Sequence, residues 1–174
     1  MAQKCRVLWI EDGARYDLVN MAAPVYMDGK YDLFIAEDAS SGMAYLLKDT
    51  FDAIIVDIRI PPGMDKDWIN LHKKSGADKV SARLGLDFLY TILGDQDAEI
   101  NLGDSRPRWI TPTKIGVLTV ESQLELDQHL KRLQITVYQQ KRAETPEEIL
   151  LELIQKILAQ TNNDGRGAQS QCVI

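Results

Sequence analysis

The sequence of 174 residues contains only two cysteines, Cys5 and Cys172, and they stand at opposite ends of the chain. A small protein stapled by disulfides needs several cysteines at closer spacing, so this class is excluded. Cys5 opens an apolar segment and Cys172 lies in a polar one. We therefore expect no disulfide and a reducing, cytoplasmic environment.

Long hydrophobic runs are also missing. No apolar segment approaches the roughly 20 residues that a membrane span requires. The chain does not start with a basic segment followed by an apolar run, the pattern of a secretory signal. The formal net charge is -6, which argues against a broad nucleic-acid-binding surface. Glycine-rich phosphate loops of the nucleotide-binding types are absent as well. We expect neither a membrane nor a nucleic acid as a partner.

Hydrophobic residues make up 45% of the chain, enough for one sizeable core. They gather in five short apolar runs, at residues 5–10, 31–36, 53–57, 115–120 and 135–138. Runs such as AIIV and VLWI are nearly continuous instead of alternating with polar residues. This pattern is typical of strands buried on both faces, as in a parallel sheet.

Five helical segments follow the strands in turn. They are predicted at residues 14–27, 40–47, 84–93, 122–133 and 145–159. Ser122 and Glu125 have the spacing of a capping box, and Thr145 followed by Pro146 is typical of a helix start. Strand and helix therefore alternate five times. This order predicts an α/β fold with a doubly wound, five-stranded parallel sheet and helices on both faces.

The interval between the third and fourth strands is far longer than one helical connection needs. We assign residues 1–161 to a single domain with insertions within 61–83 and 94–114, and residues 162–174 to a polar C-terminal tail. Both insertions are expected to lie over the functional edge of the sheet. Trp68 and Trp109, which lie in them, are expected to anchor them to the core.

Polar residues stand where the predicted strands end. Glu11 and Asp12 follow the first strand, Asp57 ends the third, Thr119 lies near the end of the fourth, and Lys141 follows the fifth. In a doubly wound sheet these positions share one edge, where ligands bind. Three gathered carboxylates repel each other and favour a divalent cation, best Mg²⁺. A lysine beside them suits the negative charge of a transferring phosphoryl group.

Taken singly, each of these residues has an ordinary structural explanation. Glu11 and Asp12 suit a helix N-terminus, Asp57 a turn, Thr119 a strand, and Lys141 a solvated surface. Only their order along the chain, together with their shared edge, indicates a site.

That order resembles the receiver domain of two-component signalling. The motifs that carry the resemblance are V-L-W-I-E-D, I-I-V-D-I-R-I-P, V-L-T-V-E-S and V-Y-Q-Q-K, within roughly residues 4–159. The resemblance implies the sheet order 2-1-3-4-5 and makes Asp57 the phosphoryl acceptor. It further implies a catalytic Lys141, the switch residues Thr119 and Tyr138, and Mg²⁺ held by Glu11, Asp12, Asp57 and the carbonyl of Arg59.

The implied function is that of a stand-alone response regulator in a phosphorelay. It would accept a phosphoryl group from a histidine kinase or phosphotransfer protein and signal to a downstream protein. It would catalyse its own phosphoryl transfer and dephosphorylation without being a conventional enzyme. The resemblance also allows a homodimer.

Two departures from the receiver pattern keep an alternative open. Arg142 stands where the family usually has proline after its lysine, and the chain after Pro61 is much longer than usual. The alternative is a receiver-like interaction module that does not depend on phosphorylation. A phosphatase of the haloacid-dehalogenase type is disfavoured, because Arg59 occupies the position of the second aspartate that it needs.

Overall fold

The computed structural model describes residues 3–13, 17–75 and 83–164. Its five strands form one parallel sheet in the order β2-β1-β3-β4-β5. The strands are β1 (Cys5–Ile10), β2 (Tyr31–Ala36), β3 (Ala53–Val56), β4 (Ile115–Thr119) and β5 (Val137–Gln140). The predicted α/β class and sheet order are confirmed. Every residue of β3 and β4 is buried, as their continuous apolar sequences indicated.

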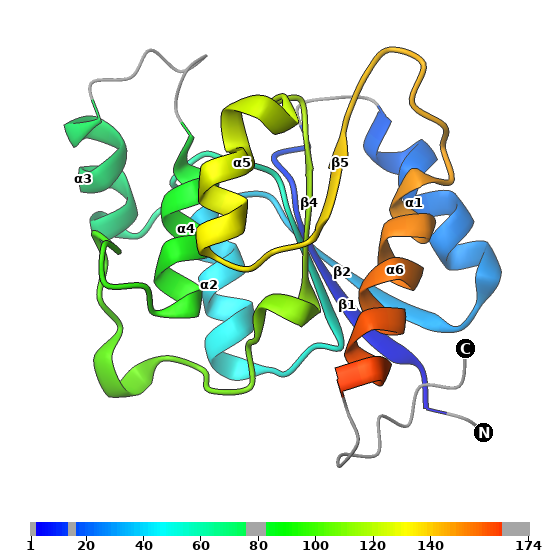
Figure 1. Cartoon of the computed structure of the whole chain (residues 1–174), viewed down its shortest axis with the longest axis horizontal. Helices are drawn as coiled ribbons and strands as arrows, with labels where there is room; N and C mark the ends of the chain where they lie inside the picture. The colour runs from blue at the N-terminus through cyan, green and yellow to red at the C-terminus, as the bar shows by residue number, and fades with distance from the viewer. Residues whose placement is uncertain (1–2, 14–16, 76–82, 165–174) are drawn as a thin grey trace.

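Helices cover both faces of the sheet (Figure 1). Helices α1 (Asp17–Asp28) and α6 (Ile149–Asp164) pack on one face, where their side chains join the core around Trp9. Helices α2 (Ala39–Lys48), α4 (Leu84–Leu93) and α5 (Gln123–Arg132) contribute to the core on the other face, around Phe88. Two short 3-10 turns, η1 (Gly103–Ser105) and η2 (Pro112–Lys114), precede β4.

Helix ends follow the local chemistry in some places and not in others. The capping box of α5 is formed, with the Ser122 hydroxyl accepting from the Glu125 amide and the Glu125 carboxylate accepting from the Ser122 amide. The predicted start of the last helix at Thr145 is wrong. Thr145 Oγ1 instead accepts the Arg142 N–H at 2.7 Å, which closes a turn before α6 begins at Ile149.

One helix within the first insertion was missed from sequence. Helix α3 (Lys66–Lys74) begins at Asp65, whose carboxylate accepts from the amides of Asp67 and Trp68. The Trp68 ring packs 5.5 Å from Phe88 of α4, centroid to centroid, and is buried. The expectation that Trp68 anchors the insertion is confirmed. Asp65 before an amphipathic stretch was the capping signal that could have revealed this helix.

The two insertions do not both lie over the carboxyl edge of the sheet, as expected. The first starts there, since Asp65 N–H donates to Ser40 Oγ at the start of α2. The second runs to the opposite edge. Trp109 packs on Phe51, the residue two places before β3, and Lys114 Nζ donates to the Phe51 carbonyl. For residues 94–114 the expectation is therefore wrong, because their apolar side chains are drawn to the aromatic cluster at the amino ends of the strands.

Cys5 is buried at the start of β1 and is disulfide-bonded, so the expectation of a reduced thiol there is wrong. Cys172 lies outside the described residues. Across the described ranges, no helix has both the length and the apolar character to cross a bilayer.

Candidate functional site

The site starts where β1 and β3 end side by side. In their register, Ile10 pairs with Val56, so Glu11 and Asp57 emerge next to each other. The backbone continues the pairing, with Asp57 N–H donating to the Ile10 carbonyl at 2.9 Å. Both residues are only 4% exposed. The sheet thus places two acidic side chains together in a poorly solvated position.

Lys141 reaches these carboxylates from β5. Its amide donates to the Thr119 carbonyl at 2.6 Å, which holds the first residue after β5 against the end of β4. Its Nζ lies 2.6 Å from Glu11 Oε2 and 2.7 Å from Asp57 Oδ2. No cis peptide bond occurs among the described residues. A trans peptide with Arg142 therefore suffices to place this lysine.

Electrostatics in the cluster follow from burial. Desolvation is the largest cause that raises the pKa of Glu11, to about 7, and the neighbouring Asp57 charge adds to it. Burial alone would lower the pKa of Lys141, but the two carboxylates outweigh burial and raise it. Lys141 therefore stays protonated at neutral pH. One buried cation serves two buried carboxyl groups.

Thr119 is the last residue of β4, and Tyr138 lies within the neighbouring strand β5. Thr119 is fully buried, and its Oγ1 accepts the Glu121 N–H at 3.4 Å. The hydroxyl of Tyr138 donates to the Glu121 carbonyl at 2.6 Å. Burial and the nearby charges of Glu121 and Glu125 raise the pKa of Tyr138, so it remains a neutral donor. Both residues are linked to the backbone of one loop, at Glu121.

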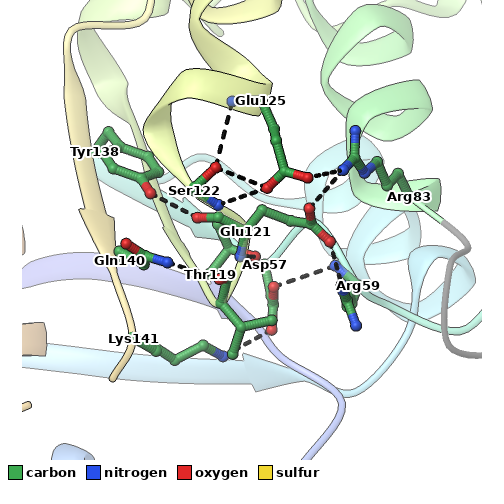
Figure 2. Close-up of polar contacts among 11 residues, drawn as sticks. Asp57, Arg59, Arg83, Thr119, Glu121, Ser122, Glu125, Tyr138, Gln140 and Lys141 are labelled. Atoms are coloured by element: carbon green, nitrogen blue, oxygen red, sulfur yellow. Dashed lines mark hydrogen bonds and ion pairs between the residues drawn. The ribbon is translucent and has the colours of Figure 1, made fainter. Parts of the chain in front are cut away.

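A group of charged residues missed from sequence lies next to Asp57 (Figure 2). The buried Glu121 carboxylate pairs with Arg59 at 2.5 Å and with Arg83 at 2.7 Å. Arg83 also reaches Glu125 at 3.1 Å. These residues come from three loops and a helix terminus that are remote in sequence. No local motif predicts them, although an acidic residue two places after Thr119 was visible.

The predicted metal ligands are only partly drawn together. Glu11 and Asp57 share the buried cluster, while Asp12 is half-buried beside them. The backbone N–H of Arg59 donates to Asp57 Oδ1 at 3.1 Å, and its side chain turns to Glu121. Among the described residues, no group of three or more His, Cys, Asp or Glu side chains is arranged to hold a metal. Mg²⁺ commonly binds through one or two carboxylates and keeps its waters, so the buried acidic pair suits it.

Comparison with known proteins places this geometry on a known fold. No protein-family model matches the chain, and no curated protein matches it either. Among solved structures, a receiver domain of Methanospirillum hungatei matches with a TM-score of 0.59 and 17% identity, over 94% of this chain and 100% of the other. A chemotaxis response regulator of Vibrio cholerae matches with a TM-score of 0.55 and 22% identity, over 90% and 100%. This chain has the receiver-domain fold. A Francisella response-regulator receiver domain, at TM-score 0.55 and 16% identity over 92% and 99%, agrees.

Proposed function

We propose that the chain is a response-regulator receiver in a phosphorelay and that Asp57 accepts the phosphoryl group. The observation that carries the proposal is the buried cluster of Asp57, Glu11 and Lys141 at the carboxyl edge of a receiver fold. Asp57 Oδ2 lies 2.7 Å from the buried ammonium of Lys141, and an aspartate carboxylate can act as a nucleophile. The same ammonium lies where a transferred group would carry negative charge.

In the proposed reaction, an oxygen of Asp57 attacks the phosphorus of a phosphohistidine. The phosphorus–nitrogen bond breaks, its electron pair stays on the imidazole, and that ring takes up a proton. Lys141 offsets the negative charge on the phosphoryl oxygens. Water later attacks the phosphorus, the bond to Asp57 breaks, and the carboxylate and inorganic phosphate are released.

Mg²⁺ is the proposed cofactor, with Glu11, Asp12, Asp57 and the carbonyl of Arg59 as the residues that would hold it. The ion would supply positive charge to the oxygens of the transferring group. Its charge would also relieve the repulsion between the two buried carboxylates. In this proposal Thr119 would donate its hydroxyl to a phosphoryl oxygen on Asp57, and Tyr138 would respond through the loop at Glu121.

The proposed partners are proteins. A histidine kinase or phosphotransfer protein would be the donor, and a downstream protein in the cytoplasm would read the phosphorylated state. The domain would catalyse its own phosphorylation and dephosphorylation and act on no other substrate.

The test is transfer of phosphate to the purified protein from acetyl phosphate or a phosphorylated histidine protein, with Mg²⁺ present. Intact-mass measurement should show one added phosphoryl group that hydroxylamine removes, as expected for an acyl phosphate. The Asp57→Asn variant should not be labelled. The Asp32→Asn variant, which changes an exposed carboxylate on β2, is the matched control and should be labelled normally. Labelling of Asp57→Asn at the wild-type level would refute the assignment.

A second candidate is an interaction module that works without phosphorylation. The added helix α3, which gives this receiver fold an extra surface beside α4, favours it. Magnesium-dependent binding of beryllofluoride, a phosphoryl mimic, by the wild-type protein but not by Asp57→Asn would decide against it.

A further inference from the structure

Glu121 holds two arginines at the entrance to the acceptor site. Its carboxylate is almost completely buried, and each oxygen has one guanidinium partner: Oε1 has Arg59 and Oε2 has Arg83. The two arginine side chains are 39% and 36% exposed. A buried carboxylate is stable only when paired, so these contacts hold the loop after β4 in place.

The two arginines are held differently. Arg83 has a second carboxylate, Glu125, which the capping box fixes at the start of α5. For Arg59, the described residues provide an ion pair with Glu121. Arg59 also follows Asp57 by two residues, and its amide already donates to Asp57 Oδ1 at 3.1 Å. Of the two, Arg59 is thus closer to the acceptor and held by fewer carboxylates, as Figure 2 shows.

Glu121 is also the residue to which Thr119 and Tyr138 are joined. Its N–H donates to Thr119 Oγ1 and its carbonyl accepts from the Tyr138 hydroxyl. Both residues therefore contact the backbone of the residue whose side chain holds the two arginines. Glu121 thus links the two arginines, through its side chain, to Thr119 and Tyr138, through its backbone, without any intervening residue.

We propose that Arg59 is shared between Glu121 and the phosphoryl group on Asp57, with Glu121 as a positioning residue that competes for it. A guanidinium binds phosphoryl oxygens in a bidentate manner, which favours transfer of Arg59 to the new group. Glu121 would keep Arg83 and lose one partner, and the segment 119–122 would be released from the acceptor loop. This inference rests on the proposed function, because it needs a phosphoryl group on Asp57.

The first measurement uses the metal-free protein. In the wild type, the Nε–H of Arg59 donates to Glu121, so its NMR signal should exchange slowly with water. Exchange should become fast in Glu121→Gln and stay slow in Arg83→Gln, the matched control that removes the other ion pair of the same carboxylate. Fast exchange in both the wild type and Glu121→Gln would overturn the proposal.

The second measurement is the affinity for beryllofluoride with Mg²⁺, in a double-mutant cycle. Glu121→Gln should bind the mimic about 3- to 10-fold more tightly than the wild type, and Arg59→Gln about 3- to 10-fold more weakly. In the Arg59→Gln background, Glu121→Gln should not change the affinity further, because the guanidinium for which Glu121 competes is gone. Arg83→Gln should not tighten binding.

Two outcomes separate the inference from the function beneath it. If the wild type fails to bind the mimic, the proposed function is overturned, and the proposed sharing of Arg59 is overturned as well. The other outcome is that the wild type binds the mimic while Glu121→Gln binds it no more tightly, or while Glu121→Gln has the same effect in the Arg59→Gln background. Either result overturns the proposed sharing of Arg59 and leaves the proposed function standing. Both arginines are partly solvated, so the single variants are expected to fold, and thermal unfolding verifies this.

Discussion

The Nζ of Lys141 lies 2.7 Å from Oδ2 of Asp57, although 84 residues separate them in sequence. It contacts Glu11 at the same time. The contact forms because β5 brings the lysine to the edge where β1 and β3 end. Since both carboxyl groups are buried, the position of this single cation affects stability as well as chemistry.

Replacing Lys141 with methionine should destabilise the metal-free protein. The change leaves two buried carboxyl groups without their cation, and breaking such a pair costs about 3–5 kcal/mol. Urea unfolding should show a larger loss of stability at pH 8 than at pH 5, because at pH 5 Glu11, whose pKa is raised to about 7, can take up a proton. Lys131→Met, which removes an exposed pair with Asp127, should cost less than about 1 kcal/mol. Equal stability of Lys141→Met and wild type at pH 8 would contradict this.

Glu11 should make the metal-free protein less stable as pH rises from about 4.5 to 7. Its folded pKa, about 7, exceeds its ordinary value of 4.5, so the folded state binds more protons within this window. The Lys141 pKa is also raised, and its stabilising effect is lost only at pH above 10.5, so it adds no slope here. The loss should be on the order of 2–3 kcal/mol. With a chelator present, the free energy of unfolding of Glu11→Gln should depend less on pH than that of the wild type. An unchanged slope would refute the assignment.

Gly85→Ala should displace the acceptor loop. A Cβ at Gly85 would lie 2.1 Å from the Asp57 carbonyl oxygen and 2.6 Å from Ile58 Cα, both backbone atoms. The α4 terminus would have to move, at a cost of at least about 2–3 kcal/mol. Beryllofluoride binding should weaken with it. Gly103→Ala is the control. A Cβ at Gly103 would have no atom within 4 Å, so only the strain of an alanine at positive φ should destabilise the protein, by about 1 kcal/mol. Wild-type stability of Gly85→Ala would show that the contact is not tight.

Trp68→Ala should weaken the attachment of α3. Trp68 is 3% exposed and packs on Phe88, so truncation leaves a cavity that costs about 3–5 kcal/mol. Amide exchange should rise across Lys66–Lys74 in particular. Asn70→Ala, an exposed change on the same helix, should stay within about 0.5 kcal/mol of wild type. If both variants were equally stable, α3 would contribute nothing to the core.

The sequence pattern was enough to predict the sheet and the helices that cover it, except for α3 and the start of α6. Continuous apolar runs marked strands buried on both faces, and β1, β2 and α4 have the predicted bounds. The residues at the strand ends could also be predicted to form one site, because parallel strands place their carboxyl ends together. Asp57, Glu11 and Lys141 could therefore be grouped before any contact was known.

The contacts that join these residues to the rest of the molecule depend on the packing of the folded chain. Glu121, Arg59 and Arg83 meet through packing of separate loops, and pairs formed across such distances leave no local spacing in the sequence. The second insertion likewise lies at the amino ends of the strands, because the half-buried Trp109 packs against Phe51. Periodicity reports which residues seek the core, but packing selects the surface on which a connection lies.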